Sequence, residues 1–286
     1  MARLSDRNPA SVDGRWFVDR RCIDCDVARQ HAPDLIGALP DGLSVVVRQP
    51  STPDEELLMW RAALACPTLS IGTTDRAQPP TGVYPWELTP GVSLLGHNDR
   101  TSFGAHSWYV PRPGGGVMID APHWANELVD AIEKLGGLHH VLLTHRDDIA
   151  DAERYADRFG ASVVIHEDDR SAAPFATSLI VGEGEQTIAD GVIAIPVPGH
   201  TRGSVVYMID QRWLFTGDTL AWFPKQSRLG AFRDATWYSW DVLRNSLERL
   251  AASGHRFEWV LPGHGKWHGA TAEEMHQHLV DLVAGM

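Results

Sequence analysis

The sequence predicts an α/β fold, preceded along the chain by a smaller α+β domain. Apolar runs of strand length occur at residues 117–119, 140–144 and 162–166. Amphipathic segments at residues 126–135 and 150–159 lie between these runs and have the residue spacing of helices. Strands that alternate with helices in this way are typical of a layered α/β domain.

A stretch rich in Thr, Gln and Pro separates this region from the N-terminal quarter of the chain. Such a composition is typical of a loop or linker, because these residues favour turns over regular structure. We therefore expect a small domain at residues 1–74, a linker at 75–85 and the layered domain at 86–286. With 286 residues, of which 43% are hydrophobic, the chain can bury one large and one small core.

The N-terminal domain is expected to contain short strands and two helical segments. Residues 14–20 and 43–48 have strand-like composition, and residues 26–31 can form a helical turn. The clearest helix covers residues 53–65, where acidic residues occupy the first turn and apolar residues share a broad face. A Cys-Pro pair directly after this segment ends the helix.

Further elements are expected on both sides of the alternating region. The last helix begins at Thr271, and Glu274 completes a capping box with it. Another helix is expected at residues 240–252. Additional strands are expected at residues 92–95, 107–110, 192–197, 205–209, 213–215 and 259–261.

The charge balance narrows the kinds of partner. The chain has 25 basic and 37 acidic residues and a net charge of -12, which disfavours nucleic acid and anionic membranes. Its N-terminus lacks the apolar core of a signal peptide, and no apolar stretch approaches the roughly 20 residues of a spanning helix. We therefore expect a cytoplasmic protein that acts on a small-molecule substrate, with no nucleic-acid or membrane partner.

Four residues that can bind a metal ion follow strand-like runs. His200, Asp218 and His264 each come directly after a glycine, and His145 follows the run at 140–144. Loops at strand ends can bring side chains from distant parts of a chain to one point, and histidine and aspartate are common metal ligands. The pattern therefore predicts a metal site built from four separate loops.

The motifs around these residues resemble the metallo-β-lactamase superfamily. Pro-Gly-His-Thr-x-Gly-Ser at 198–204, Thr-Gly-Asp at 216–218 and Pro-Gly-His at 262–264 are close to its glyoxalase II-like hydrolase branch. The resemblance covers roughly residues 86–275 and implies a four-layer αββα sandwich with metal at one edge. It also implies that Asp120, at the end of an earlier strand, supports the ligands without binding the metal itself.

The second metal motif departs from the superfamily pattern Thr-His-x-His-x-Asp-His. Asp147 stands where that pattern has its second histidine, and the last histidine is absent. We align Asp151 with the family aspartate across a two-residue insertion, and Asp148 is the competing candidate. A carboxylate in place of an imidazole hardens the site and favours iron or manganese over zinc.

The resemblance implies two neighbouring metal sites. The first contains His145, Asp147 and His200, with Asp218 as a bridging ligand. The second contains Asp151, Asp218 and His264 and is one ligand short. We therefore expect one firmly bound divalent ion, which is zinc, iron or manganese, and a second ion that is weaker or missing.

The expected activity is hydrolysis of a small ester, thioester or lactone-type substrate, because a bound metal activates water and polarises a carbonyl. Asp151 is the residue expected to orient the water or to move its proton. Two alternatives stay open. One is an iron-dependent oxidoreductase, as in the flavodiiron branch, where a carboxylate also replaces the second histidine. The other is a non-catalytic metal-binding or sensor protein with eroded sites.

Cys22, Cys25 and the pair Cys66-Pro67 resemble a bacterial ferredoxin module over residues 14–72. That resemblance implies an iron–sulfur cluster held by four thiolates, and a redox partner protein is a further expectation. Ala28 occupies one ligand position. A three-iron cluster, a four-iron cluster with an open iron, and a module that has lost its cluster all remain open, and we favour the last.

Overall fold

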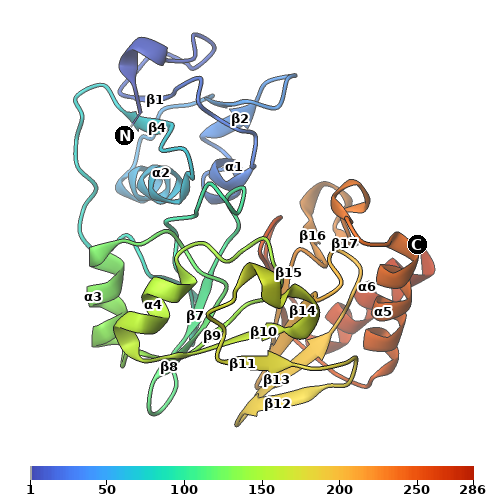
Figure 1. Cartoon of the computed structure of the whole chain (residues 1–286). Coiled ribbons are helices and arrows are strands. Elements are labelled where there is room, and N and C mark those ends of the chain that lie inside the picture. The colour runs from blue at the N-terminus through green and yellow to red at the C-terminus, as the bar shows by residue number, and fades with distance from the viewer. Residues whose placement is uncertain (1) are drawn as a thin grey trace. The chain divides into compact units, whose positions relative to one another are not determined.

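The computed structural model describes residues 2–286 (Figure 1). They form two compact units. One contains the chain up to Val110 together with Pro122–Leu135, and the other contains Pro111–Ala121 and Gly136–Met286. The domain limits at residues 74, 75, 85 and 86 stay a prediction.

The N-terminal part of the first unit has two small antiparallel sheets, β1 with β4 and β2 with β3, and two helices that pack together. Thr52 caps the longer helix by accepting a hydrogen bond from the backbone N–H of Glu55, which confirms the helix predicted at 53–65. The elements are η1 (Leu4–Asp6), β1 (Trp16–Val18), α1 (Val27–His31), β2 (Ile36–Ala38), β3 (Ser44–Val46), α2 (Pro53–Ala65) and β4 (Ile71–Thr73).

The rest of the first unit contains three strands and one helix. Strands β5, β6 and β7 pair antiparallel in sequence order, so each is joined to the next by hydrogen bonds. The residues of β7 are all buried, as an apolar run of this length predicts. The elements are β5 (Trp86–Thr89), β6 (Val92–Leu94), β7 (Trp108–Val110) and α3 (Asn126–Lys134).

The second unit begins with a parallel set of strands in the order β8, β9, β10, β11. Parallel strands end at the same edge of a sheet, so the loops after β8, β9 and β10 emerge on one side. Helix α4 packs against β9 and β10. The elements are β8 (Gly116–Ile119), β9 (Leu138–Leu142), α4 (Ala152–Phe159), β10 (Ser162–His166), η2 (Glu167–Ala172) and β11 (Ser178–Ile180).

A second sheet in this unit has the strand order β12-β13-β14-β15-β18-β19. Its neighbours pair antiparallel except β15 and β18, which are parallel. A separate hairpin joins β16 to β17. The elements are β12 (Gln186–Ala189), β13 (Val192–Pro196), β14 (Val205–Ile209), β15 (Trp213–Gly217), β16 (Ala221–Phe223), η3 (Pro224–Gln226), β17 (Arg228–Gly230), η4 (Arg233–Ala235), β18 (Trp259–Pro262) and β19 (His268–Gly269).

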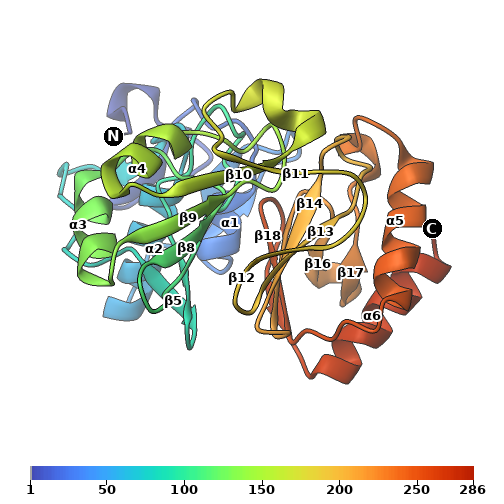
Figure 2. The same cartoon turned by 60° about the horizontal axis from the view of Figure 1, so that its bottom comes forward.

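Two long helices, α5 (Trp240–Ala252) and α6 (Ala272–Ala284), cover the outer face of this second sheet (Figure 2). Leu247 and Leu279 from the helices share one buried core with Val206 and Leu214 from the strands. The predicted capping box at the start of α6 is present. Burial of these apolar side chains is the main force that holds the helices on the sheet.

The two sheets of the second unit face one another. Tyr207 of β14 donates a hydrogen bond to the carbonyl of Leu143, and the N–H of Val205 donates to that of Thr144. Helix α4, the two sheets and the pair α5 and α6 therefore form four layers, which confirms the predicted α/β fold class (Figure 2). Within residues 2–286, no helix has the length and apolar character needed to cross a membrane.

Candidate metal centre

Four of the predicted ligands lie just beyond the end of a strand in the second unit. His145 follows β9, His200 follows β13, Asp218 follows β15 and His264 follows β18. Because β15 and β18 are parallel neighbours, Asp218 and His264 emerge at the same sheet edge. The hydrogen bonds between the two sheets near Thr144 bring the His145 loop to the same place.

A first group of donors consists of two imidazoles and two carboxylates. His145 Nε2 lies 3.8 Å from Asp218 Oδ2 and 3.9 Å from Asp147 Oδ2. His200 Nε2 lies 3.7 Å from Asp218 Oδ2 and 3.6 Å from Asp147 Oδ2. Four ligands about 2.1 Å from one ion in a tetrahedron stand about 3.4 Å apart. His145, His200 and Asp218, whose donor atoms lie within 4.8 Å of one another, are close to that spacing, and Asp147 lies near both imidazoles.

A second group contains Asp148, Asp218 and His264, whose donor atoms lie within 4.8 Å of one another. His264 Nδ1 is 2.8 Å from Asp218 Oδ1 and 2.9 Å from Oδ2. Asp148 Oδ2 is also 4.0 Å from His145 Nε2. Asp218 therefore belongs to both groups of donors.

The structure brings Asp148, and not Asp151, to these histidines. Asp148 is 1% exposed, whereas Asp151 precedes the first residue of α4. The reason is local: Ala150 has φ of +39°, so the chain turns sharply between the buried carboxylate and the start of the helix. We therefore use Asp148 in place of Asp151 in the ligand set proposed below.

The donors fit a divalent cation by their burial as well as their spacing. Among the residues that the structure describes, His145 Nε2, His200 Nε2 and both carboxylate oxygens of Asp148 are buried and make no hydrogen bond. Leaving such groups unsatisfied costs about 1–3 kcal/mol each. A cation that accepts their lone pairs removes this cost, and imidazole with carboxylate is a donor set that zinc, iron and manganese all use.

Hydrogen bonds outside the cluster orient the two imidazoles. His145 Nδ1 lies 3.0 Å from the hydroxyl of Thr144, which donates to Asp120 over 2.9 Å. His200 Nδ1 lies 2.5 Å from the carbonyl of Ala235. Both rings are thereby held with Nε2 toward the cluster, and Asp120 has the supporting place that the resemblance implies.

Asp169 connects the two loops that carry these histidines, and the sequence analysis missed it. Its Oδ2 accepts hydrogen bonds from the backbone N–H of Arg146 over 3.1 Å and from the hydroxyl of Thr201 over 2.6 Å. The carboxylate is 1% exposed. Its place shortly after strand β10 was the available signal, since the loops after neighbouring strands meet at this edge.

Burial and mutual repulsion shift the pKa values in the cluster. Burial lowers the pKa of His145 to about 4, so its imidazole is neutral and can bind metal at neutral pH. Burial, with repulsion from Asp218, Asp120 and Asp147, raises the pKa of Asp148. Burial opposes ionisation of Asp218 too, but the nearby histidines outweigh it and hold the pKa of this carboxyl below its usual value.

An exposed aromatic pair borders the site. The backbone N–H groups of Trp237 and Tyr238 donate to the carbonyl of His200 over 3.0 and 2.9 Å. The Trp237 ring lies 6.2 Å from the His200 ring and is 69% exposed. Arg202 lies over the Tyr238 ring at 4.9 Å. These side chains can therefore contact a molecule that approaches the histidines.

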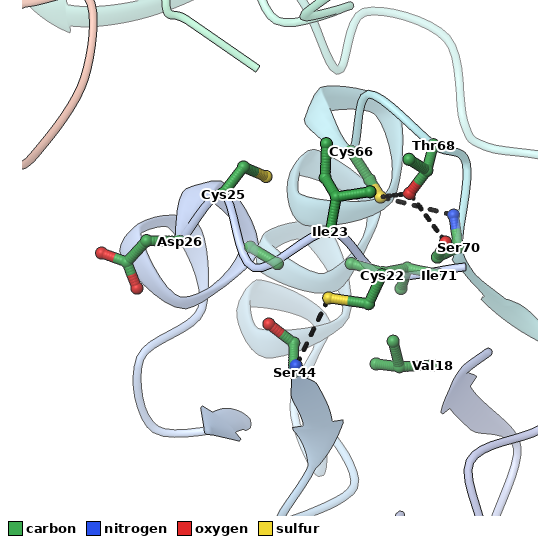
Figure 3. A pocket seen from close by; sticks show the side chains of 11 residues that line it. Val18, Cys22, Ile23, Cys25, Asp26, Ser44, Cys66, Thr68, Ser70 and Ile71 are labelled. Carbon is green, nitrogen blue, oxygen red and sulfur yellow. Dashed lines mark hydrogen bonds between the residues drawn. The ribbon is translucent and has the colours of Figure 1, made fainter. Parts of the chain in front are cut away.

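The three cysteines lie in the first unit around one small cavity (Figure 3). All three are free thiols. The N–H of Ser44 donates to Cys22 Sγ over 3.4 Å, and the N–H of Ser70 donates to Cys66 Sγ over 3.3 Å. Ala28 lines the same cavity, so the residue at the missing ligand position borders the same space as the three cysteines.

Comparison with protein families gives two matches. Residues 89–286 match the metallo-beta-lactamase superfamily, and residues 18–73 match the 4Fe-4S single cluster domain of ferredoxin I. The resemblances drawn from the sequence are thus confirmed for both parts of the chain.

Among curated proteins, the hydroxyacylglutathione hydrolase of Acidiphilium cryptum is 35% identical over 119 residues, which is 40% of this chain and 49% of that protein. The enzyme of the same name from Brucella ovis is 33% identical over 109 residues, which is 36% of this chain and 42% of that enzyme. An uncharacterized protein of Mycobacterium tuberculosis is 32% identical over 157 residues, which is 44% of this chain and 68% of that protein. The chain spans about half the length of the two hydrolases it matches.

Among solved structures, the DIM-1 metallo-beta-lactamase superposes with a TM-score of 0.53 and 19% identity, over 69% of this chain and 95% of that chain. The BLEG-1 B3 metallo-beta-lactamase superposes with a TM-score of 0.52 and 20% identity, over 67% of this chain and 99% of that chain. At these identities the superpositions show a shared fold.

Proposed function

Because this chain belongs to the metallo-β-lactamase superfamily, we propose that it is a hydrolase of a small ester, thioester or lactone that works with metal-activated water. The observation that supports this most is the shared position of Asp218, whose carboxylate lies among both groups of donors. The name hydroxyacylglutathione hydrolase of two relatives supports hydrolysis at an acyl group.

The proposed ligand set has two parts. His145, His200 and Asp147 hold the first ion, Asp148 and His264 hold the second, and Asp218 lies between them. When bound, such an ion lowers the pKa of water to about 7 and polarises a carbonyl. Asp147 takes the place of an imidazole in the first site, so that site keeps its number of donors. The second site is one imidazole short of the superfamily pattern, so we expect the second ion to bind more weakly.

The chain's own residues would then position the reactants. Burial and its acidic neighbours raise the pKa of Asp148, and a cation bound at the second site would hold this carboxyl in its ionised form as a ligand. Trp237 and Tyr238 offer aromatic faces beside His200 for the apolar part of a substrate. Asp151, which the sequence favoured as the water-orienting residue, takes no part in this proposal.

Metal content and hydrolysis of the His200→Ala variant test the proposal. The purified protein is loaded with zinc, ferrous iron or manganese and assayed on short esters, thioesters and lactones. We expect metal content and hydrolysis to fall together in His200→Ala, because one buried ligand is lost. His139→Ala, at an exposed strand position, is the control. Hydrolysis that survives complete loss of metal contradicts the proposal.

An iron-dependent oxidoreductase is the second candidate. Two histidines and one carboxylate, here His145, His200 and Asp218, form the donor set of many non-haem iron enzymes. If the loaded iron protein consumes oxygen and none of the esters is hydrolysed, this candidate replaces the first. A protein that binds no metal under any loading condition would instead be the non-catalytic scaffold.

A further inference from the structure

The cysteine cavity is a second site for metal chemistry, and the proposed hydrolysis leaves it unused. Cys22, Cys25, Cys66 and Ala28 line it together (Figure 3). We propose that it holds a three-iron iron–sulfur cluster bound by the three thiolates, in place of the four-iron cluster named for the domain that residues 18–73 match.

A single metal ion does not fit the three thiols. A zinc ion bound to thiolates at about 2.3 Å needs sulfur atoms about 3.8 Å apart. Across residues 2–286, the groups of donors that lie within 4.8 Å of one another do not include Cys22, Cys25 and Cys66 together. Sulfur atoms spread more widely around one cavity suit a cluster, whose several irons bridge the distance.

In a four-iron cluster, the iron that a cysteine at position 28 would bind has no protein ligand here. Ala28 presents a methyl group there and is 7% exposed, so neither a protein donor nor open solvent is at hand. The only lining carboxylate, Asp26, accepts hydrogen bonds from Arg29 over 2.5 Å and from Gln30 over 3.1 Å, and it points away from the sulfurs (Figure 3). A cluster that lacks this iron needs the three available thiolates and no more.

Hydroxyl groups on the cavity wall are engaged as well. Ser44 Oγ accepts a hydrogen bond from Arg29 over 2.9 Å. The hydroxyls of Thr68 and Ser70 lie 2.7 Å apart and bond to one another. These oxygens stabilise the loops around the cysteines and are not placed as a replacement for the missing thiolate.

The backbone around the cysteines keeps features that favour a retained cluster over a lost one. Asp24 and Asp26 both have positive φ, of 59° and 65°, on either side of Cys25. Such conformations cost a non-glycine residue about 1 kcal/mol or more and collect at functional sites. Two backbone N–H groups also point at sulfur atoms, and hydrogen bonds of this kind tune cluster potentials.

Gly104 closes one side of Cys25. A Cβ atom at this position would meet Cys25 Sγ at 3.2 Å and the Pro67 ring at 3.1 Å. Its φ of +89° also favours glycine. The backbone of the 104 loop therefore lies against the cysteine from outside the segment that carries the ferredoxin-like motif, and it shields that sulfur from water.

Cluster insertion requires the cavity to widen. Its volume is about 10 Å3, which is about the room that one water molecule needs. Residues 22–25 form neither helix nor strand, and Cys22 and Cys25 are half-buried. Insertion therefore requires a shift of this loop, whose backbone is not held in a helix or strand.

Spectroscopy of the reconstituted full chain tests the proposal without any activity assay. The protein is supplied with ferrous iron and sulfide under anaerobic conditions and desalted, and iron and inorganic sulfide are counted before any oxidant is added, because oxidation can release an iron that has no protein ligand. The cluster is then oxidised mildly. Three ferric ions have an odd number of electrons, so an oxidised three-iron cluster gives an electron paramagnetic resonance signal. An oxidised four-iron cluster has an even number and gives none. Besides this signal, the protein should contain iron and inorganic sulfide in the proportion of a three-iron cluster. Both are counted in the His200→Ala variant, so that iron bound at the other metal site does not add to the total.

Ala28→Cys is the matched variant, because it supplies the missing thiolate at the same place. We expect it to lose the signal of the oxidised cluster and to gain iron per sulfide, whereas Ala28→Ser keeps the wild-type behaviour. Wild-type protein that retains no sulfide overturns the proposal in favour of cluster loss. Wild-type protein with the four-iron proportion before oxidation overturns it in favour of a cluster with an open iron.

Discussion

Asp147 is the residue at which this metal centre differs most from the superfamily pattern. Its carboxylate lies 3.6 Å from His200 Nε2 and 3.9 Å from His145 Nε2, and its side chain is 47% exposed. Replacement by histidine should tighten zinc binding about tenfold, or about 1.4 kcal/mol, because zinc prefers an imidazole ligand to the carboxylate that it replaces. Competition with a chromophoric chelator measures the affinity. Asp147→Asn, the control, should weaken binding, and tighter zinc binding by Asn would refute this account.

Asp169 is a positioning residue, since it acts on the ligands through Arg146 and Thr201. Asp169→Ala leaves the buried hydroxyl of Thr201 and the partly buried N–H of Arg146 without their acceptor, so unfolding by urea should show a loss of about 1–3 kcal/mol. Metal affinity should also fall, by about 10- to 100-fold, as for other residues that orient ligands. Asp168→Ala, at the exposed neighbouring position, should change neither. Normal metal affinity in Asp169→Ala would limit this residue to a structural role.

Sequence patterns predicted the histidines of the metal centre better than its carboxylates. His145, His200 and His264 each stand in a motif at a strand end, and strand ends meet at one sheet edge. The carboxylates at 147, 148 and 151 stand in one short loop, where the direction of each side chain depends on backbone turns. The positive φ of Ala150 is invisible in the sequence, and for that reason the alignment favoured Asp151 over Asp148.

At the level of elements, the hydrogen bonds that cap α6 lead to a prediction about stability. Thr271 Oγ1 accepts from the N–H of Glu274 over 3.3 Å, while Glu274 accepts from the N–H of Thr271 over 3.0 Å. Thr271→Ala should destabilise the protein by about 1 kcal/mol in urea unfolding, because α6 covers the core of the second sheet. Glu273→Gln keeps both hydrogen bonds and is the control. An unchanged unfolding midpoint in Thr271→Ala would show that the cap adds nothing to the packing of this helix.

Elements with strong local signals were predicted well, and elements that depend on tertiary pairing were not. The helix at 53–65 has acidic residues, a cap and a stop in its own sequence, and the structure gives the same bounds. The strand predicted at 14–20 shortens to Trp16–Val18 because only these residues pair with β4. The strands that were missed are short ones defined by their partners and not by their composition: β2, β4, β5, β11, β12, β16, β17 and β19.

At the level of the whole molecule, metal removal should lower thermal stability. An ion at about 100 times its dissociation constant stabilises the folded state by about 2.7 kcal/mol. For a chain of this size, a chelator should therefore lower the melting temperature by roughly 5–10 °C. Scanning calorimetry measures the change, and the His200→Ala variant should respond less. An equal response in both proteins would place the stabilising ion elsewhere.

The fold class and family could be read from the sequence because a few short motifs carry them. Gly-His and Gly-Asp pairs at strand ends are specific and stay visible when the rest of the sequence varies. The division into two compact units could not be read in this way, since residues 122–135 join the first unit from within the second unit's segment of chain. Such a division depends on packing between distant segments.

The metal content of the Asp218→Ala variant tests the central claim most directly, because this carboxylate is the one residue common to both groups of donors. Elemental analysis after anaerobic loading should find that Asp218→Ala loses the bound divalent metal, while Asp151→Ala retains the wild-type amount. Full metal content in Asp218→Ala, or loss of metal in Asp151→Ala alone, would contradict the account.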